Sequence, residues 1–471
     1  MNIETKPLPR RDFLRVALAA AALVPLGGSL ASCAASGGGD EGSNGPAGTV
    51  SDTNPFGMPD NSTIDAVIFK GGYGIDYAMF AGKLVEKNHP GTTAKVAPST
   101  NIAQELQPRF VGGNPPDVID NSGANLIGIN TILNQLEDLT PVIEAKNLEG
   151  TAIKDTLYPG VLSPGTFGDK LAAINYVLTV FGLWYSASLF EQNGWAPPKT
   201  WDEAMALGAK AKAKGKYLFG WGKEAATYYL ELAIASAIKE GGDEVRLALD
   251  NLKEDCWSHP AVQRVLQSME KIVQAGYVKP GGSGTVFTAA QAQWSNAQDV
   301  ILYPSGSWIE NEMKDQTKSG FDMTGAPVPT STSGATMPYT AMHTAAAEAY
   351  IVPSQAKNVA GGKEFLRTML SKEAATNFAQ KIRSTTIVKD TVPADGFGST
   401  ALVSQIKMLK DAGDNVFTWG FVDVYGMNKD LLVVWNTFLD GKSDTATLTS
   451  AMQKITDKVR NDDSINKIEV K

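Results

Sequence analysis

The sequence predicts an α/β protein of two lobes, built on doubly wound sheets, with a hinge between the lobes. The chain has 471 residues, which is too many for one ordinary hydrophobic core. Hydrophobic residues make up 43% and charged residues 20%, a balance that is typical of a globular protein. Short apolar segments alternate with amphipathic ones, which favours parallel strands joined by helices.

One segment in the middle of the chain predicts the crossing from one lobe to the other. Residues 172–185 carry no charge and are rich in β-branched and aromatic side chains, so we expect a buried strand or strand pair. A short helix over residues 188–193 should end at Gly194. Thr200 and Glu203 have the spacing of a capping box, which predicts a helix from Trp201 onward.

The elements around this crossing follow from the same patterns. Before it, we expect strands at 64–69, 94–97 and 117–119, separated by two helices. Ligands of such sheets bind beyond the carboxyl ends of the strands, which here are residues 71–76 and 120–122. After the crossing, we expect strands at 217–221, 300–303 and 349–352, and helices at 260–273, 362–370 and 372–379. Ser307 and Glu310 form a second capping box, which places Trp308 on the first turn of a helix.

The first residues predict export and lipid attachment. Residues 10–15 match the twin-arginine export pattern, and an apolar run follows over residues 16–30. The run ends in Leu30-Ala31-Ser32-Cys33, which resembles the site that lipoprotein signal peptidase cleaves. Cys33 would then carry lipid at the new N-terminus. Cys256 is the only other cysteine, so we expect no internal disulfide and interpret Cys256 as a structural thiol.

Composition and charge limit the classes of partner that we expect the protein to bind. The net charge is −8; four basic and two acidic residues in the first 32 positions leave −10 for the rest. Nucleic acid is not an expected partner, because binding phosphates requires a basic patch. Residues 33–60 contain no Lys or Arg and are rich in Gly, Ser, Asn and Pro, so we expect a flexible tether.

Several motifs, in their order, resemble the family 1 extracellular solute-binding proteins of sugar ABC importers. They include Leu183-Trp184-Tyr185, Leu189-Phe190, Pro197-Pro198, Thr200-Trp201-Asp202-Glu203, Gly113-Asn114-Pro115-Pro116-Asp117-Val118, Gly306-Ser307-Trp308 and Ile351-Val352-Pro353. The position after Tyr185 is often Asn in that family and is Ser186 here. The overall likeness is greatest to actinobacterial lipoproteins that bind N-acetylglucosamine and its β-1,4 dimer, chitobiose.

The resemblance implies a periplasmic-binding-protein fold that closes over a carbohydrate and delivers it to membrane permease subunits. We expect a signal peptide at 1–32, the tether at 33–60, a first lobe from 61–178 and 320–383, and a second lobe from 179–319 and 384–471. The protein would be a lipid-anchored monomer on the outer face of the cell membrane. No cofactor, metal ion or catalysed reaction is expected.

Aromatic and polar residues near strand ends are the candidates for ligand binding. Tryptophan offers a flat apolar face to a sugar ring, and buried hydroxyl and acetamido groups need hydrogen-bond partners. In the family, a Gly-x-Trp at the position of Trp308 supplies a stacking ring. Each polar candidate could equally cap a loop, and half or more of the nine tryptophans should be plain packing. The candidates are Tyr73, Asp120, Asn121, Asn175, Thr179, Trp221, Trp308, Arg383, Trp419 and Tyr425.

Other functional classes have less support from the sequence. A Gly-x-Ser-x-Gly motif is missing, and the three histidines lack metal-ligand spacing. Gly441-Lys442-Ser443 lacks the first glycine of a phosphate loop, because residue 436 is Asn. A glycosidase needs two carboxylates at a fixed separation, and the 50 acidic residues leave that alternative open. A binding protein for another oligosaccharide also remains open, whereas the exposed repeats of an adhesin are not seen.

Overall fold

A mixed sheet forms the centre of the first lobe. The computed structural model describes residues 48–123, 125–465 and 467–470, all within one compact unit of the chain. Strand β1 (Thr63–Phe69) pairs in parallel with β2 (Thr93–Ser99) and β3 (Val118–Asp120). Next to β3 the sheet continues with antiparallel strands: β9 (Met342–Ile351), β6 (Ile174–Ser186) and β10 (Thr385–Thr386). The expected parallel pairing is therefore limited, in this part of the sheet, to β1–β3, and β11 (Val416–Phe417) also pairs in parallel with β9.

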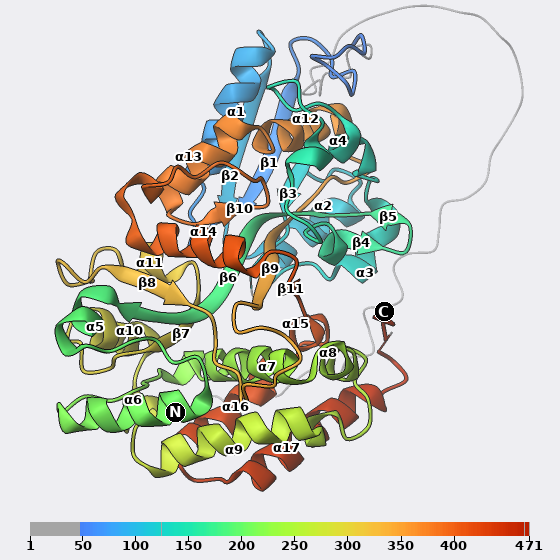
Figure 1. The fold of residues 1–471 in the computed structure, drawn as a ribbon. Helices are drawn as coiled ribbons and strands as arrows, with labels where there is room; N and C mark the ends of the chain where they lie inside the picture. The colour runs from blue at the N-terminus through green and yellow to red at the C-terminus, as the bar shows by residue number, and fades with distance from the viewer. Residues whose placement is uncertain (1–47, 124, 466, 471) are drawn as a thin grey trace, which may run out of the picture. The chain divides into compact units, whose positions relative to one another are not determined.

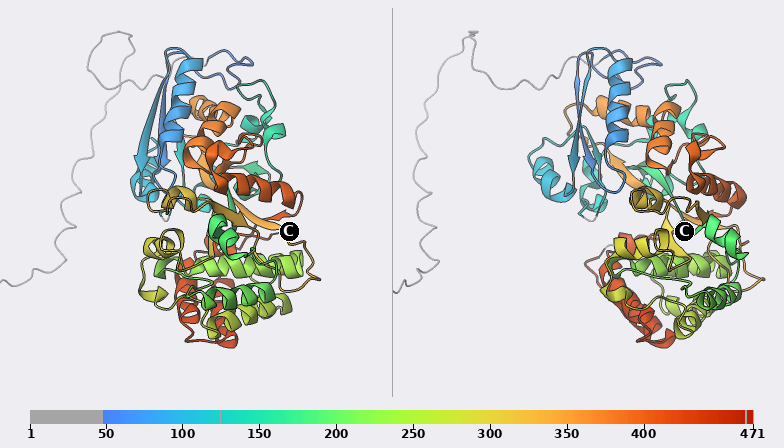
Figure 2. Two further views of the ribbon diagram at one scale, coloured as in Figure 1. Left: turned by 60° about the vertical axis from the view of Figure 1, so that its left-hand side comes forward. Right: turned by 90° about the vertical axis from the view of Figure 1, so that its left-hand side faces the viewer.

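Helices cover both faces of this sheet. Successive residues of β1 point to opposite sides, and apolar side chains on both sides are buried against helices. Ile64, Ala66 and Ile68 pack in one cluster with α1 (Asp76–Asn88), α12 (Val359–Met369) and α13 (Lys372–Ile382). Val67 packs in another cluster with α2 (Ile102–Val111). Figure 2 shows α1 and α2 on opposite sides of the blue strands.

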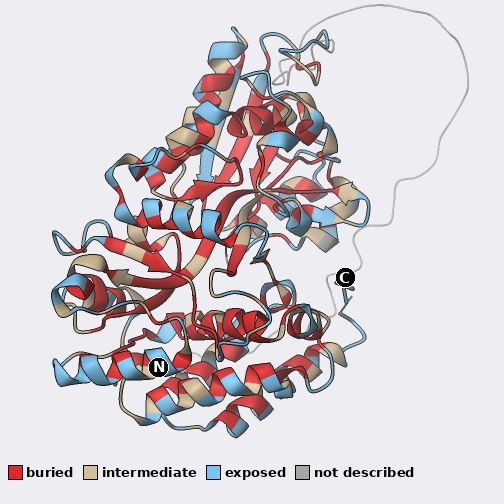
Figure 3. Ribbon diagram, viewed as in Figure 1, coloured by how far each residue is buried: buried red, intermediate tan, exposed pale blue. Residues whose placement is uncertain are grey.

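Strand β6 is the crossing that the sequence predicts. Its first half pairs with β9 and β10, and its residues 181–186 pair with β7 (Tyr303–Gly306) and β8 (Met323–Ala326). One unbroken strand thus joins the sheets of both lobes, and Figure 1 shows it running from one to the other. Its residues are buried along almost the whole length (Figure 3), as expected for an uncharged, β-branched run with neighbours on both edges.

The helices after the crossing begin where local capping predicts. Helix α5 (Ala187–Asn193) ends at Gly194, which has the left-handed φ of 62° that glycine tolerates. Helix α6 (Trp201–Ala213) is capped by Thr200, whose Oγ1 accepts a hydrogen bond from the backbone N–H of Glu203 at 3.2 Å. The carboxylate of Glu203 accepts from the N–H of Lys199 at 2.7 Å, one residue before the position that a capping box predicts.

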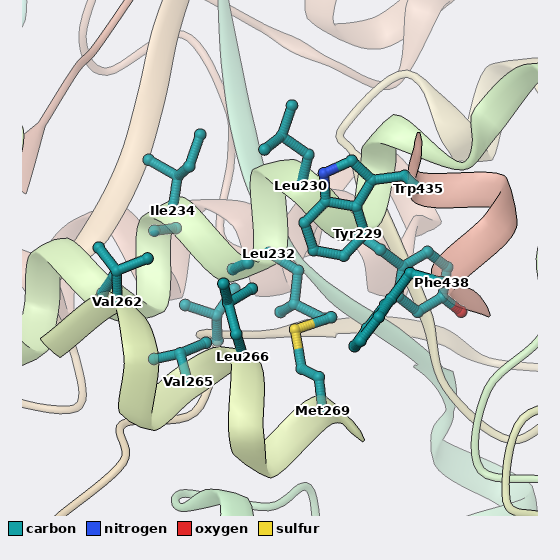
Figure 4. Packing of buried hydrophobic residues seen from close by; sticks show 14 of the residues in the cluster. Tyr229, Leu230, Leu232, Ile234, Val262, Val265, Leu266, Met269, Trp435 and Phe438 are labelled. Atoms are coloured by element: carbon teal, nitrogen blue, oxygen red, sulfur yellow. The ribbon is translucent and has the colours of Figure 1, made fainter. Parts of the chain in front are cut away.

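The second lobe is organised around helix α7 (Thr227–Gly241), which is apolar on nearly every side. Helix α9 (Pro260–Gln274) and helix α16 (Asn428–Leu439) pack against it through Leu266, Met269, Trp435 and Phe438 (Figure 4).

The remaining longer helices of the chain are α8 (Asp243–Asp250), α10 (Phe287–Ser295), α14 (Thr400–Ala412) and α17 (Thr445–Arg460). The shorter elements, in both lobes, are α3 (Ile129–Ile132), α4 (Thr140–Glu144), β4 (Thr166–Phe167), β5 (Lys170–Leu171), α11 (Ile309–Met313), β11 (Val416–Phe417) and α15 (Phe421–Val424).

The boundary expected at residue 320 is wrong. Residues 323–326 form β8 and pair with the second-lobe half of β6, and the chain up to Tyr339 stays there. The buried Nζ of Lys239 on α7 donates to the carbonyl oxygens of Val328 and Tyr339, both at 2.6 Å. The return to the first lobe runs along β9, from Met342. The expected second-lobe start at residue 384 is also displaced, because β10 pairs with the first-lobe half of β6.

The expected tether is shorter than residues 33–60. Residues 48–60 pack on the first lobe, where Met58 is buried and Asp52 forms an ion pair with Lys146 at 3.0 Å. Nη2 of Arg367 donates to the carbonyl oxygen of Thr53 at 3.4 Å. A polar segment that cannot form a core of its own is held here by a neighbouring lobe. The predicted signal peptide and Cys33 lie outside the described residues.

Candidate functional site

Trp308 lies at the corner between β7 and α11. Strand β7 begins at Tyr303, three residues later than expected, because Ile301 and Leu302 bond to the backbone of residues 217 and 218 instead. Trp308 is the residue before α11 rather than on its first turn. The predicted capping box is wrong: Ser307 Oγ accepts from the N–H of Val180 at 3.3 Å, and Glu310 accepts from Ser399 Oγ.

Gly306 determines where the Trp308 ring lies. A Cβ atom at position 306 would lie 2.0 Å from Cζ3 of Trp308, so only glycine lets the ring fold back onto β7. The ring meets Phe181 and Tyr228 edge to face, with centroids 5.6 Å and 5.8 Å away. Trp308 stays partly exposed, which leaves some of its surface free for a ligand.

The first lobe contributes a polar cluster at the carboxyl end of β3. Asp120 is fully buried and accepts from Ser122 Oγ at 2.5 Å, and the hydroxyl of Tyr77 is 3.5 Å from its other oxygen. Burial, and then the neighbouring carboxyl of Glu348, raises the pKa of Asp120. Burial also raises the pKa of Glu348, so burial favours the neutral form of both acids.

Tyr73 connects this cluster to the second lobe. Burial raises its pKa, the nearby hydroxyl groups of Thr179 and Ser384 oppose the rise, and the charges of Glu348 and Glu312 add to it. Ser384 Oγ is also 3.2 Å from Ser307 Oγ, next to Trp308. The structure thus brings Tyr73, Asp120, Thr179 and Trp308 together from four separate parts of the chain.

A stack of aromatic rings extends the site along the second lobe. His343 lies parallel to Phe181 at 4.5 Å and to Trp419 at 5.2 Å between centroids. Burial lowers the pKa of His343 to about 3. Its Nδ1 is 3.5 Å from Oε2 of Glu231, whose pKa is raised by burial and then by Asp423. The two shifts favour the neutral forms, so this contact is not an ion pair.

Several predicted candidates are engaged elsewhere. Asn121 bonds the backbone N–H and C=O of Ile127, both at 2.8 Å, and Arg383 donates to the carbonyl oxygens of Gly396 and Phe397. Asn175 donates to the carbonyl oxygen of Ala346 at 2.8 Å, although its Oδ1 has no partner among the described residues.

Two predicted aromatic candidates are also engaged within the second lobe. The ring of Trp221 packs flat on Gly282 and is 2% exposed, and its Nε1 donates to Asn436 at 3.1 Å. The hydroxyl of Tyr425 accepts from the N–H of Ile468 at 3.0 Å. These contacts favour structural roles over ligand contacts.

Five further residues near this site were not predicted from the sequence: Phe181, Tyr228, Glu231, His343 and Glu348. One signal was available: Glu231 is the single acidic residue in the apolar stretch 227–238 of α7, and a lone charge inside such a run suggests a site. His343 carries no such signal, since its partners come from segments more than 70 residues away in the chain.

The site combines aromatic faces with hydroxyl and carboxyl groups, a set that suits a neutral polar ligand with apolar faces. No three His, Cys, Asp or Glu residues among those the structure describes are grouped as metal ligands. Within the described ranges, no helix is long and apolar enough to cross a membrane.

Comparison with known proteins gives consistent matches. The family model for bacterial extracellular solute-binding proteins matches residues 58–376. The chain is 57% identical over all 471 residues to the diacetylchitobiose binding protein NgcE of Streptomyces coelicolor, and the match covers 100% of both chains. The apo form of RafE from Streptococcus pneumoniae matches with a TM-score of 0.68 at 19% identity, covering 85% of this chain and 98% of that one. A sugar transporter protein from Arthrobacter chlorophenolicus with bound laminaribiose gives 0.63 at 17%, covering 84% and 99%. These two likenesses show the two-lobe fold alone.

Proposed function

Because the chain belongs to the bacterial extracellular solute-binding protein family, we propose that it binds diacetylchitobiose and delivers it to an ABC importer. The observation that carries the choice of sugar is the 57% identity, over the full length of both chains, to a diacetylchitobiose binding protein. The partly exposed ring of Trp308, with Tyr73 packed in the same cluster, supports a sugar site between the lobes, whereas Asp120 is fully buried.

Binding would act by favouring the closed arrangement of the lobes. Asn311 on α11 donates to the carbonyl oxygen of Gly72 in the first lobe at 2.6 Å, so the lobes already touch beside Trp308. A sugar that contacts both lobes stabilises the closed state relative to the open one, which shifts the population toward closure. The continuous strand β6 lies at the junction where such a hinge would bend.

No chemical step is proposed for the bound sugar. The buried acids Asp120 and Glu348 are the nearest to a catalytic pair, but Asp120 is 0% exposed and a glycosidase acid must reach the glycosidic oxygen. The purified protein should therefore leave diacetylchitobiose intact over hours. Release of N-acetylglucosamine at protein concentrations far below that of the sugar would show an enzyme instead.

A ligand panel tests the proposal. Thermal unfolding is followed with diacetylchitobiose, N-acetylglucosamine, cellobiose and raffinose. At a hundredfold excess over Kd, a true ligand adds about 2.7 kcal/mol to the free energy of unfolding. We expect diacetylchitobiose to raise Tm most. A rise with raffinose alone would assign the protein to another oligosaccharide.

The proposal includes a lipid anchor at Cys33 after twin-arginine export, on the outer face of the membrane and next to the permease subunits. The motif Leu30-Ala31-Ser32-Cys33 supports it. Cys33→Ala should release the protein from the membrane fraction into the medium, as measured by fractionation and immunoblot. Membrane retention equal to that of the parent protein would contradict the anchor.

A further inference from the structure

A small apolar cavity lies between α7 and the strands β6 and β7. Its base is formed by the buried side chains of Leu232, Ala235 and Val328, and its other walls include Gly182 and Pro304. The free space holds about one water-sized group. A methyl group is of similar size, and the accessible surface inside the cavity is almost entirely apolar, which favours a methyl group over a water.

The rim of the cavity faces the site described above. Phe181, Tyr228 and Glu231 are partly exposed, whereas the side chains of the base are buried, so the opening is on the rim side. Phe181 and Tyr228 are the two rings that contact Trp308, with centroids 5.6 Å and 5.8 Å from it. A sugar lying on Trp308 would therefore have the cavity within reach of a ring substituent.

Two polar atoms of the cavity lining have no hydrogen-bond partner among the described residues, Oγ of Ser305 and Oε2 of Glu231, and Glu231 is the one at the rim. Oε2 of Glu231 is buried and forms no hydrogen bond with any residue that the structure describes. The 3.5 Å contact with Nδ1 of His343 is too long to count as one. A buried carboxyl oxygen without a partner is costly, so a hydrogen-bond donor of the ligand would be favoured at this point.

We propose that this cavity binds an acetamido group of the sugar, with the methyl group in the apolar base and the amide N–H directed to Glu231. In the trans amide, the N–H and the methyl group lie on the same side of the C–N bond. An acceptor beside a methyl-sized apolar hole matches that arrangement. This subsite rests on the proposed function and predicts that the site distinguishes diacetylchitobiose from cellobiose, whose hydroxyl groups cannot fill an apolar hole.

Acyl-chain length and cavity size test the subsite together. Dissociation constants for diacetylchitobiose, dipropionylchitobiose and cellobiose are measured by calorimetry with the parent protein and three variants. Ala235→Val fills the base, Val328→Ala enlarges it, and Ala233→Val is the matched control on the same helix, buried but outside the cavity. Unfolding curves confirm that each variant is folded.

The expected pattern follows the size of the hole. The parent protein binds the dipropionyl sugar about tenfold or more weakly than the diacetyl sugar, because one extra methylene does not fit. Ala235→Val weakens diacetylchitobiose by about the same factor, Ala233→Val leaves it unchanged, and Val328→Ala brings the two acyl sugars within about threefold of each other.

Two results would overturn the subsite alone. These are equal binding of the two acyl sugars by the parent protein, and unchanged diacetylchitobiose binding by Ala235→Val. Cellobiose binding as tight as that of diacetylchitobiose would overturn acetamide recognition but leave a sugar receptor. No binding of any of the three sugars would overturn the proposed function as well.

Discussion

Trp308 is our main candidate for stacking on a sugar, because part of its ring is exposed. Its ring rests on Gly306 and touches two other rings, yet it remains partly exposed. Trp294 is the opposite case, since it is fully buried among Tyr303 and Phe321. The two tryptophans therefore separate the effects of binding and stability.

Trp308→Ala should weaken diacetylchitobiose binding about ten- to a hundredfold, or about 1–3 kcal/mol, because it removes a stacking face. Tm without ligand should fall little. Trp294→Ala should instead lower the free energy of unfolding by about 3–5 kcal/mol and leave the affinity of the folded fraction unchanged. Calorimetric Kd and unfolding curves check both, and a large loss of stability with unaltered affinity would remove Trp308 from the site.

His343 predicts a pH dependence of stability. An unfolded chain protonates its histidine near pH 6.5, whereas burial holds the pKa of His343 at about 3 in the folded state. The unfolded state therefore binds more protons between these values, and stability present above pH 6.5 is lost as the pH falls toward 3. Buried acids with raised pKa, such as Asp120 and Glu231, act in the opposite direction.

His343→Phe isolates this contribution, because it keeps the stack with Phe181 and Trp419 and removes the titration. Between pH 6.5 and pH 5, the free energy of unfolding of the parent should fall by about 2 kcal/mol relative to that of the variant. Denaturant unfolding at both pH values measures the difference. Equal pH dependence would mean that folded His343 takes up a proton, paired with Glu231.

Among the helices and strands, those with a clear local signal were predicted well from the sequence. Strand β6 is long and uncharged, and helix α6 has a capping residue, so both are confirmed within a few residues. Strand β7 was misplaced by three residues because Val300–Tyr303 is more apolar than β7 itself. Ile301 and Leu302 instead donate to the carbonyl oxygens of Tyr217 and Leu218, which the sequence does not reveal.

The candidate site was predictable only in part, because local patterns place some of its residues and contacts between distant segments place the others. Trp308 follows a local Gly-x-Trp pattern, and Asp120 follows a strand end, so both could be placed. Asn121 and Arg383 bond to their own loops, which residue type alone does not reveal. His343 belongs to the site through contacts that only the folded chain creates.

The corner between β7 and α11 predicts how a change at Gly306 affects the Trp308 ring and sugar binding. Gly306→Ala should displace the Trp308 ring and weaken sugar binding by about tenfold, or about 1.4 kcal/mol. In a Trp308→Ala background the same change should add little, because the ring it moves is gone. A double-mutant cycle measures this. Equal effects in both backgrounds would mean that Gly306 acts through strand pairing with Phe181 instead.

At the scale of the whole molecule, the lobes are joined by strands and touch beside the site. The chain crosses along β6 and returns along β9, and the two strands pair with each other over the junction. The boundaries at residues 320 and 384 were mispredicted because apolar segments of both lobes look alike in sequence. Pairing partners, not composition, assign β8 to one lobe and β10 to the other.

The side chain of Asn311 offers a test of whether the two lobes close over the sugar. Its bond to the carbonyl oxygen of Gly72 joins the lobes and should exist only when they are closed. Asn311→Ala should weaken sugar binding about two- to tenfold, the usual worth of one hydrogen bond, without changing the unfolding of the free protein. Asn296→Ala is the control, because it removes a similar exposed bond within the second lobe. Equal affinities for the two variants would contradict closure through this contact.

A calorimetric titration of the purified protein with diacetylchitobiose, followed by chromatography of the recovered sugar, shows directly whether the protein binds this sugar and leaves it intact. We predict saturable binding at one site per chain, tighter than for cellobiose, with the disaccharide recovered intact. Absence of heat at any sugar concentration, or recovery of the monosaccharide, would contradict the claim that this chain is a diacetylchitobiose receptor.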